Sequence, residues 1–308
     1  MTLRTAAYDT KGISMRAGVV GLGRMGRALA ARLLGEHNEV VVWNRSPGPV
    51  EVAVGLGARA ATSLAELWDG TVAVCSFLSD DDALRSVVLG EAGLFAAAPH
   101  GAILVEMSTV SPSASAEVAT AGAERGVAVL RCPVSGNPAV LQAGRLVLIC
   151  SGDRGAFEAA LPLLQAVGPV VHHVGTGEQA RVLKLAINTM VAGTSQLLAE
   201  AIALCEAWGL ERAAALDVIA SSAVGSPFVG YKRQALVERD YSATFTTSML
   251  GKDLGLARRA AEQVDLRLPV LDRVAELVEE TCADGYADLD FTALLPHLQR
   301  QTGQVPDV

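Results

Sequence analysis

Two polar side chains, Lys184 and Asn188, interrupt an otherwise apolar stretch of the chain. They are four residues apart, so on a helix they lie on one face and one turn from each other. A lysine that burial partly desolvates has a lowered pKa, and it can then exchange a proton with a substrate oxygen near neutral pH. The alternative is a lysine that extends from the helix start into solvent beside a hydrogen-bonded asparagine.

The stretch that carries this pair is predicted to be one long helix, from Glu178 to Trp208. Glu178 places an acid in the first turn, and Gly209 stands where a C-terminal cap is expected. At ~1.5 Å per residue the helix would span about 45 Å, so we expect it to cross between domains. Apolar residues lie on every side, so we expect it to be buried nearly all round. A membrane span is disfavoured because four polar residues lie in the apolar window, namely Lys184, Asn188, Gln196 and Glu200.

A second motif lies near the start of the chain, where an expected strand runs into a glycine-spaced loop. The first glycine allows a tight turn, the second lets the backbone approach a pyrophosphate, and the third lets the next helix pack close to the strand. The position between a strand and a helix predicts a dinucleotide site, with a purely structural glycine turn as the alternative. The loop residues are Gly21, Leu22, Gly23, Arg24, Met25 and Gly26.

The end of the next expected strand indicates which dinucleotide binds. An NAD site usually has an acid there to hold the ribose hydroxyls, whereas this chain has Asn44, Arg45 and Ser46. These side chains suit a 2′-phosphate, so we expect NADP, with NAD as the other candidate cofactor. For Arg45 the alternative is an exposed loop charge.

Hydroxyl groups also follow two later strands. Thr109 precedes a helix that begins near Pro112, and Ser135 lies in a similar arrangement within Cys132–Asn137. Ligands of open α/β sheets bind at the carboxyl ends of strands, so we expect both hydroxyls to face the cofactor crevice. Each motif is also compatible with an ordinary helix N-cap.

Short apolar runs alternate with helical stretches up to about residue 174, which is typical of a mostly parallel sheet with helices on both faces. We therefore predict an α/β fold with three parts: an extension at residues 1–15, a Rossmann-type dinucleotide-binding domain at residues 16–176, and an all-helical substrate and dimerisation domain at residues 177–308. The expected strands are Ala17–Val20, Glu39–Trp43, Val72–Phe77, Ile103–Met107, Val127–Leu130, Leu146–Cys150 and Val170–Val174; the expected later helices are Glu211–Ser222, Met249–Val264, Pro269–Asp284 and Phe291–Gln301.

Composition disfavours several other classes. The net charge of −8 argues against a nucleic-acid partner, and no block of like charges indicates an anionic membrane surface. The five cysteines are widely scattered, which favours free thiols, no metal site and a reducing cytoplasm.

Taken together, these motifs resemble the β-hydroxyacid dehydrogenase family, which includes 3-hydroxyisobutyrate dehydrogenases and glyoxylate/succinic semialdehyde reductases. The resemblance implies an NADP-dependent oxidoreductase that interconverts a small hydroxy acid and its semialdehyde or keto acid, with a C-terminal domain like that of 6-phosphogluconate dehydrogenases. It covers residues 16 to about 300 and rests on GLGRMG, WNRS, MSTVSP, CPVSGN, GTG followed by Lys184-x-x-x-Asn188, and Met249-Leu250-Gly251-Lys252-Asp253-Leu254.

The resemblance implies a role for each matching residue. Lys184 would be the proton donor and acceptor, with Asn188 beside it, and Ser135 and Gly136 would hold the substrate carboxylate. The implied cofactor ligands are Gly21 to Gly26, Asn44, Arg45, Ser46, Leu78, Thr109 at the nicotinamide ring, and Lys252; the implied substrate residues are Ser135, Gly136, Asn137, Phe245 in the pocket wall and Asp253, which would order the site.

Three positions depart from the family pattern. Arg131 replaces an acid before the Ser135 motif, and it would either pair with a surface acid or reinforce the anion site. Asn137 replaces a second glycine, and it would either add a hydrogen bond to the acid or crowd out larger acids. Pro49 stands where a basic residue is common in the family.

Two other functions remain open at this point. Imine reductases resemble this family but typically carry Asp or Tyr in place of Lys184, and a non-catalytic dinucleotide-binding module would need neither Lys184 nor Lys252. We also expect a homodimer, because one small helical domain could not cover a long helix that is apolar on every side.

Overall fold

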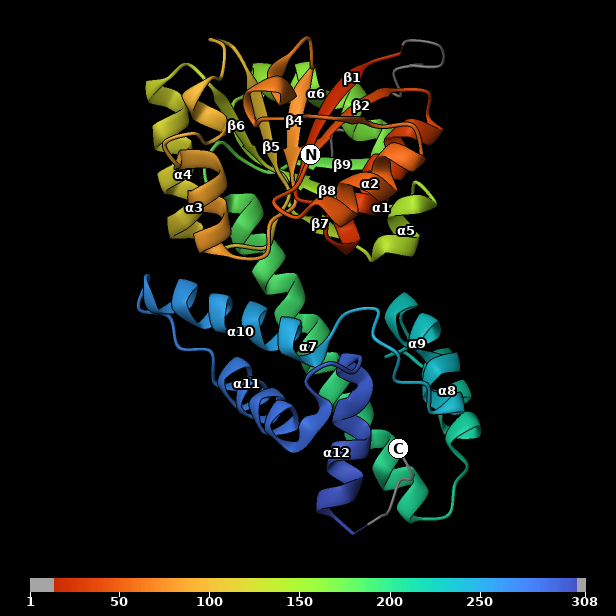
Figure 1. The fold of residues 1–308 in the computed structure, drawn as a ribbon. Coiled ribbons are helices and arrows are strands. Elements are labelled where there is room, and N and C mark those ends of the chain that lie inside the picture. Colours follow the sequence, from red (N-terminus) through yellow and green to blue (C-terminus); the bar gives the residue numbers. More distant parts are fainter. Residues whose placement is uncertain (1–13, 304–308) are drawn as a thin grey trace. The chain divides into compact units, whose positions relative to one another are not determined.

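The computed structural model describes residues 14–303, and the chain divides into two compact units, Met1–Lys184 and Leu185–Val308 (Figure 1). The division falls inside one long helix, α7 (Gln179–Ala207), which therefore contributes residues to both units. The expected extension lies outside the described residues except for Ser14 and Met15. Met15 packs against the core of the first unit.

A six-stranded parallel sheet forms the centre of the first unit (Figure 1). Its order is β3-β2-β1-β4-β5-β6, so β1 lies between β2 and β4 and the direction of winding reverses there. This is the strand order of dinucleotide-binding folds, and it confirms the predicted α/β class. The strands are β1 (Arg16–Val20), β2 (Glu39–Trp43), β3 (Arg59–Ala60), β4 (Ala73–Ser76), β5 (Ile103–Glu106) and β6 (Ala128–Arg131).

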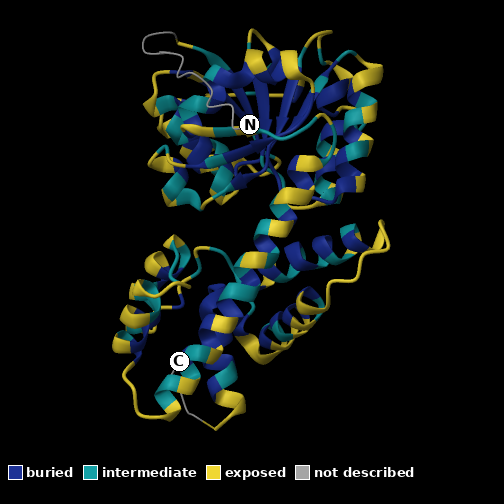
Figure 2. Ribbon diagram, turned by 180° about the vertical axis from the view of Figure 1, so that it is seen from behind, coloured by how far each residue is buried: buried dark blue, intermediate teal, exposed yellow. Residues whose placement is uncertain are grey.

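Alternate strand residues enter two separate cores, because successive side chains point to opposite faces of a sheet. Val19 and Cys75 belong to one core, whereas their neighbours Val20 and Val74 belong to the other. Figure 2 shows the strands of this sheet largely buried. The first core also takes residues of α1 (Arg24–Gly35), α2 (Pro47–Gly55), α5 (Pro138–Gln142) and α6 (Arg154–Val167), and the second those of α3 (Asp81–Leu89), α4 (Pro112–Glu124) and the 3₁₀ turns Ala65–Trp68 and Leu94–Ala96.

Two expected strands belong to a second, three-stranded sheet and not to the large one. The chain leaves the large sheet after Cys132, whose N–H donates to the Glu106 carbonyl oxygen at 2.7 Å, and on its other edge the Pro133 carbonyl oxygen accepts the Ile149 N–H of the second sheet at 3.1 Å. Apolar runs identify strands, but they do not say at which edge a strand pairs. In the second sheet β8 (Val147–Cys150) pairs in parallel with β9 (Val170–His173) and antiparallel with β7 (Val134–Ser135), a two-residue strand that was not predicted.

The helix α7 has nearly the predicted bounds. Gly209 follows it with φ 80°, and the Leu210 N–H donates to the Cys205 carbonyl oxygen at 2.9 Å, as expected for a glycine cap. Glu178 differs from the prediction, because it lies just before the first turn and its carboxylate pairs with Arg131.

The expectation that α7 is buried nearly all round is wrong. Met190, Leu197 and Leu204 are 72%, 68% and 63% exposed, and their spacing of seven residues places them on one face. The opposite side packs into the core of the second unit, which includes Leu185 and Ile202. The residue types do not reveal that the chain covers only one side. By length and composition alone α7 could also cross a membrane, a test that the core helix of a soluble protein passes as well.

The second unit is all-helical within its described residues, as predicted. The chain has one helix more than expected, α9, because its apolar residues are few and interrupted by Gly230 and charged side chains. The helices that follow α7 are α8 (Arg212–Ser221), α9 (Pro227–Glu238), α10 (Thr247–Glu262), α11 (Pro269–Thr281) and α12 (Leu294–Gln301), with a π turn at Cys282–Tyr286 and a 3₁₀ turn at Phe291–Ala293.

A buried ion pair joins α9 to the turn before α12. The Lys232 Nζ lies 2.7 and 2.8 Å from the two carboxylate oxygens of Asp290, and both side chains are less than 5% exposed. Burial alone would raise the pKa of Asp290, but hydrogen bonds from Lys232 and Thr244 outweigh it and hold that pKa below its usual value. The ammonium also lies 4.4 Å from the centre of the Phe291 ring.

We predict that Lys232→Met lowers the free energy of unfolding of the second unit by about 3–5 kcal/mol, because it leaves a carboxylate buried without its counter-charge. The neighbouring Arg233 pairs with the exposed Asp217, so Arg233→Met should lower it by less than about 1 kcal/mol. Calorimetry of both variants measures the difference. Equal destabilisation by the two changes would contradict this account.

Candidate active site

The glycine loop after β1 has the geometry that its spacing predicts. Gly21 has φ 85°, and a side chain there would overlap the Phe77 carbonyl oxygen. A methyl group on Gly26 would overlap the Gly21 carbonyl oxygen, so α1 packs directly on the turn. Around Gly23, in contrast, no heavy atom lies within 4 Å of the position that a methyl group would take. The loop therefore leaves open the glycine whose predicted role is to admit a ligand.

Two side chains of the loop point into the protein. Leu22 is buried and Met25 is half-buried, and both contribute to the first core. Any contact of Leu22 with a ligand in the loop is therefore made by the backbone. Arg24 is exposed at the start of α1.

Of the three residues after β2, Asn44 supports the glycine loop, and Arg45 and Ser46 face solvent. The Asn44 side chain accepts the Leu22 N–H at 2.9 Å and donates to the Ser46 carbonyl oxygen at 3.1 Å, so it holds the glycine loop against the end of β2. Arg45 and Ser46 are exposed. Within residues 14–303 no acidic side chain forms an ion pair with Arg45.

The N-termini of the helices differ in a way that indicates where an anion is expected. In the first unit, side chains cap α3, α4, α5 and α6. The N-termini of α1 and α2 have neither a side-chain cap nor an acid in the first turn, and that of α1 directly follows the glycine-spaced loop. Amide groups at a helix start that no side chain satisfies are suited to a phosphate. The α1 terminus, next to the open Gly23, is therefore the candidate pyrophosphate site.

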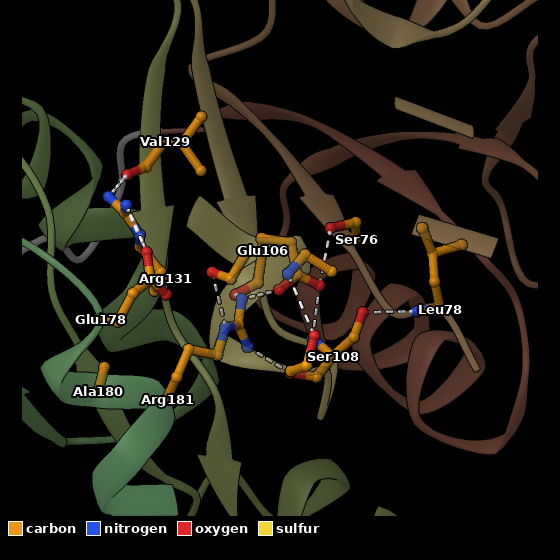
Figure 3. A network of polar contacts seen from close by, with 12 residues as sticks. Ser76, Leu78, Glu106, Ser108, Val129, Arg131, Glu178, Ala180 and Arg181 are labelled. Atoms are coloured by element: carbon orange, nitrogen blue, oxygen red, sulfur yellow. Dashed lines mark hydrogen bonds and ion pairs between the residues drawn. The ribbon is translucent and has the colours of Figure 1, made fainter. Parts of the chain in front are cut away.

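The strand ends next to the glycine loop are connected by a buried polar network (Figure 3). The Leu78 N–H donates to the Ser108 Oγ at 2.8 Å, and the Ser108 N–H donates to the Glu106 carboxylate at 2.8 Å. The Ser76 hydroxyl reaches the same carboxylate oxygen at 3.5 Å. The network fixes Leu78 and the residue before Thr109, two positions that were assigned to the cofactor.

Arg181, which the sequence did not single out, completes this network from the first turn of α7 (Figure 3). Its guanidinium is 1% exposed, pairs with the Glu106 carboxylate, and donates to the Ser108 carbonyl oxygen and to the Glu106 carbonyl oxygen. It also donates to the Ser115 hydroxyl of α4 at 3.1 Å. Burial lowers the pKa of Arg181 to about 9, so it remains charged at neutral pH. The available signal was Glu106 itself, because a carboxylate that ends a buried strand needs a counter-charge.

The motif around Ser135 lies in and after the short strand β7. Ser135 is half-buried and Gly136 has φ 139°, a conformation that favours glycine. The Asn137 Oδ1 accepts the Val140 N–H at 3.0 Å, so Asn137 is the N-cap of α5. Arg131 pairs with the half-buried Glu178 carboxylate at 2.7 Å, so of the two alternatives the pairing with an acid is the one that the structure contains.

In the second unit, a hydrogen bond and an ion pair bring three predicted residues together. The Asn188 Nδ2 donates to the Asp253 carboxylate at 2.6 Å, and the Lys252 Nζ lies 3.3 Å from its other oxygen. Asp253 is 2% exposed, so this carboxylate orders both partners from inside the unit. Phe245 packs edge-on against Phe291, with ring centres 6.0 Å apart. Lys184 belongs to the first unit and is half-buried on α7, one turn before Asn188.

Comparison with known proteins decides the family. Residues 16–175 match the model of the NAD binding domain of 6-phosphogluconate dehydrogenase, and residues 177–298 match the model described as NAD-binding of NADP-dependent 3-hydroxyisobutyrate dehydrogenase. The NAD-dependent L-serine dehydrogenase of Pseudomonas aeruginosa is 32% identical, over 92% of this chain and 98% of its own. The chain belongs to the β-hydroxyacid dehydrogenase family.

Solved structures agree with this assignment. The 3-hydroxyisobutyrate dehydrogenase of Mycobacterium tuberculosis with L-serine has a TM-score of 0.84 at 25% identity, over 93% of this chain and 100% of that one. A protein named Psf3, in complex with NADP⁺ and 2-OPP, has a TM-score of 0.85 at 26% identity, over 92% of this chain and 99% of that one. This β-hydroxyacid dehydrogenase is accordingly an NAD(P)-dependent oxidoreductase that acts on a CH–OH group.

The first unit of the dehydrogenase fits a nicotinamide dinucleotide. Gly23 and the uncapped start of α1 would hold the pyrophosphate, and Arg45 and Ser46 would hold the adenosine end. Leu78 and Thr109 follow β4 and β5, so they lie at the same edge of the sheet as the glycine loop. The donors all come from the carboxyl ends of neighbouring parallel strands.

We predict that Gly23→Ala raises the dinucleotide Kd at least about tenfold, or ~1.4 kcal/mol, without lowering the melting temperature. The added methyl group meets no protein atom and would stand where the pyrophosphate approaches. Gly26→Ala should lower the melting temperature as well, because the methyl group displaces the turn at Gly21. Gly35→Ala, also without neighbours on α1, is the control and should leave binding unchanged. Calorimetric titration with the dinucleotide measures the Kd of each variant. An unchanged Kd for Gly23→Ala would show that the glycine loop does not bind the pyrophosphate.

Proposed function

We propose that this protein is an NADP-dependent dehydrogenase that interconverts a small β-hydroxy acid, or another short hydroxy acid, and its semialdehyde or keto acid, with Lys184 as proton donor and acceptor. The observation that carries the proposal is the environment of Asn188. Its amide nitrogen is bound to the buried Asp253, so its carbonyl oxygen is the group that it can offer to Lys184, one turn earlier on α7. A lysine oriented in this way suits a proton-transfer role.

The chain's residues divide the chemistry as follows. The nicotinamide, when bound, supplies or accepts the hydride. Lys184 holds the substrate oxygen by a charge-assisted hydrogen bond, gives it a proton in reduction and takes the proton in oxidation. Asn188 orients Lys184, and Asp253 holds Asn188 in place. Lys252, paired with the same carboxylate, would provide a positive charge to the cofactor.

The substrate is expected to carry a carboxylate. Ser135 and the backbone at Gly136 would bind it, and Phe245 would line the pocket. The Asn137 Oδ1 accepts the N–H of the helix cap, and the side-chain group that can donate to an acid is the amide nitrogen. The name of the Pseudomonas relative and the ligand of the Mycobacterium structure, L-serine, support this class, because L-serine carries its hydroxyl on the carbon β to the carboxylate.

We further propose a cytoplasmic homodimer. Met190, Leu197 and Leu204 form an exposed apolar stripe on α7, and a second copy of the chain would remove it from water. A reducing compartment suits the cysteines, because all five are free.

We predict that Lys184→Met lowers kcat by at least about tenfold, ~1.4 kcal/mol of barrier, and leaves the dinucleotide Kd nearly unchanged. The best substrate is first chosen from a panel of short semialdehydes and keto acids with NADPH and NADH. Each acid is paired with a neutral aldehyde of similar size, so the same panel tests the carboxylate. A loss of kcat below this threshold would show that Lys184 is not the acid or base, and equal kcat/KM for charged and neutral partners would exclude the carboxylate site.

The preference for NADPH should depend on Arg45. A guanidinium can donate two parallel hydrogen bonds to a 2′-phosphate, and no acid competes with it at Trp43–Ser46. Arg45→Ala should therefore raise the KM for NADPH by about tenfold or more and leave the KM for NADH almost unchanged. The Pseudomonas relative is named as NAD-dependent, which makes both cofactors necessary in the measurement. A parallel rise of both KM values would show that Arg45 does not distinguish the two.

A further inference from the structure

The start of α7 is attached to the first unit by two arginine–glutamate pairs that differ in what else they touch (Figure 3). Arg131, at the end of β6, pairs with Glu178, which precedes the helix. Arg181, in the first turn of the helix, pairs with Glu106 at the end of β5. Both pairs fix the same helix start to the same edge of the sheet.

The pair of Arg131 and Glu178 makes few further hydrogen bonds. Apart from Glu178, the Arg131 guanidinium donates to the Val129 carbonyl oxygen of its own strand, at 3.4 Å. The Glu178 side chain is 20% exposed, so water reaches it when the arginine is removed. This pair is an anchor with no described connection to Leu78 or Ser108.

The pair of Arg181 and Glu106, in contrast, is hydrogen-bonded to the loops after β4 and β5, which carry the proposed cofactor ligands Leu78 and Thr109. The guanidinium holds the Ser108 carbonyl oxygen and the Glu106 carboxylate together, and that carboxylate in turn accepts the Ser108 N–H at 2.8 Å. The Ser108 hydroxyl accepts the Leu78 N–H, so one side chain fixes the loops after β4 and β5 at once. All the polar side chains involved, those of Arg181, Glu106 and Ser108, are buried.

The position of Arg181 on α7 also connects this network to Lys184. Lys184 follows Arg181 by three residues, about one turn, in a continuous α-helix. The rise between them is only ~4.5 Å, so the height of Lys184 over the sheet edge is set by the point at which Arg181 is held.

We propose that Arg181 is a positioning residue for the reaction: through Glu106 and Ser108 it fixes Leu78 and Thr109, at the nicotinamide end of the site, relative to Lys184. This inference rests on the proposed function, in which Lys184 transfers the proton and Leu78 and Thr109 bind the cofactor. An arginine is required because a lysine ammonium cannot hold the Glu106 carboxylate, the Ser108 carbonyl oxygen and the Ser115 hydroxyl in one plane.

The test compares Arg181→Lys with Arg131→Met in the full-length protein. Arg181→Lys retains the charge beside Glu106, so it should fold, and its kcat should fall roughly 10- to 100-fold, as expected for a displacement of about 1 Å between reacting groups. Its dinucleotide Kd should rise, measured by titration without substrate. Arg131→Met removes the other anchor and should leave both kcat and Kd within about twofold. Equal effects of the two variants on kcat and Kd would overturn the proposal, because both would then be structural.

A double-mutant cycle provides a second measurement. Ser108→Ala removes only the acceptor of the Leu78 N–H and leaves every charge in place. If Arg181 acts through Ser108, the double variant should lose less kcat/KM, expressed as free energy, than the sum of the losses in Arg181→Lys and Ser108→Ala. Strict additivity of the two losses would overturn the proposal. If Arg181→Lys does not fold, the Kd and kcat of Ser108→Ala decide alone. The control for the proposed function is Lys184→Met: if kcat survives that change, the proton role fails, while the Kd comparison still tests the network.

Discussion

The buried charge of Glu106 is the constraint on which the cofactor edge of the first unit depends. A carboxylate at the end of a buried strand must be paired, and its partner here comes from a helix about 75 positions later in the chain. The pairing therefore ties the last element of the first unit, the start of α7, to the end of β5 inside the large sheet. The same guanidinium holds the loop that carries Ser108, so the contact that satisfies the charge also shapes the site.

The second unit uses buried charge in the same way. The pair of Lys232 and Asp290 connects α9 to the turn before α12, and Asp253 connects α10 to α7 through Asn188. Each carboxylate joins two segments that are distant in sequence. Apolar packing alone tolerates small shifts between helices, whereas a buried ion pair with further hydrogen bonds specifies one arrangement. The residues proposed for proton transfer are thus supported by groups that fix position as well as stability.

Local patterns predicted most of the fold, and the tertiary partners were what they could not predict. The glycine spacing indicated the roles of Gly21, Gly23 and Gly26 because each role is a property of the local backbone. The two sheets were not separated, because an apolar run such as Leu146–Cys150 does not reveal its neighbours. The burial of α7 was overestimated for the same reason. Its apolar composition indicates that other segments cover the helix, but it does not show whether those segments belong to this chain. Arg181 was overlooked because the meaning of a charge on an apolar helix depends on the strand end that it meets.

Two of the three departures from the family motif, Arg131 and Asn137, were expected to affect the substrate acid, and the structure gives each of these two a local role. Arg131 is bound to Glu178 and Asn137 caps α5, so neither has its whole side chain available for a ligand. The Asn137 cap lies directly after Gly136, which means that the asparagine fixes the backbone at the proposed carboxylate site from one side. A second glycine at this position would leave that backbone freer. The replacement therefore favours a rigid anion site, and a rigid site selects acids by size more strictly than a flexible one.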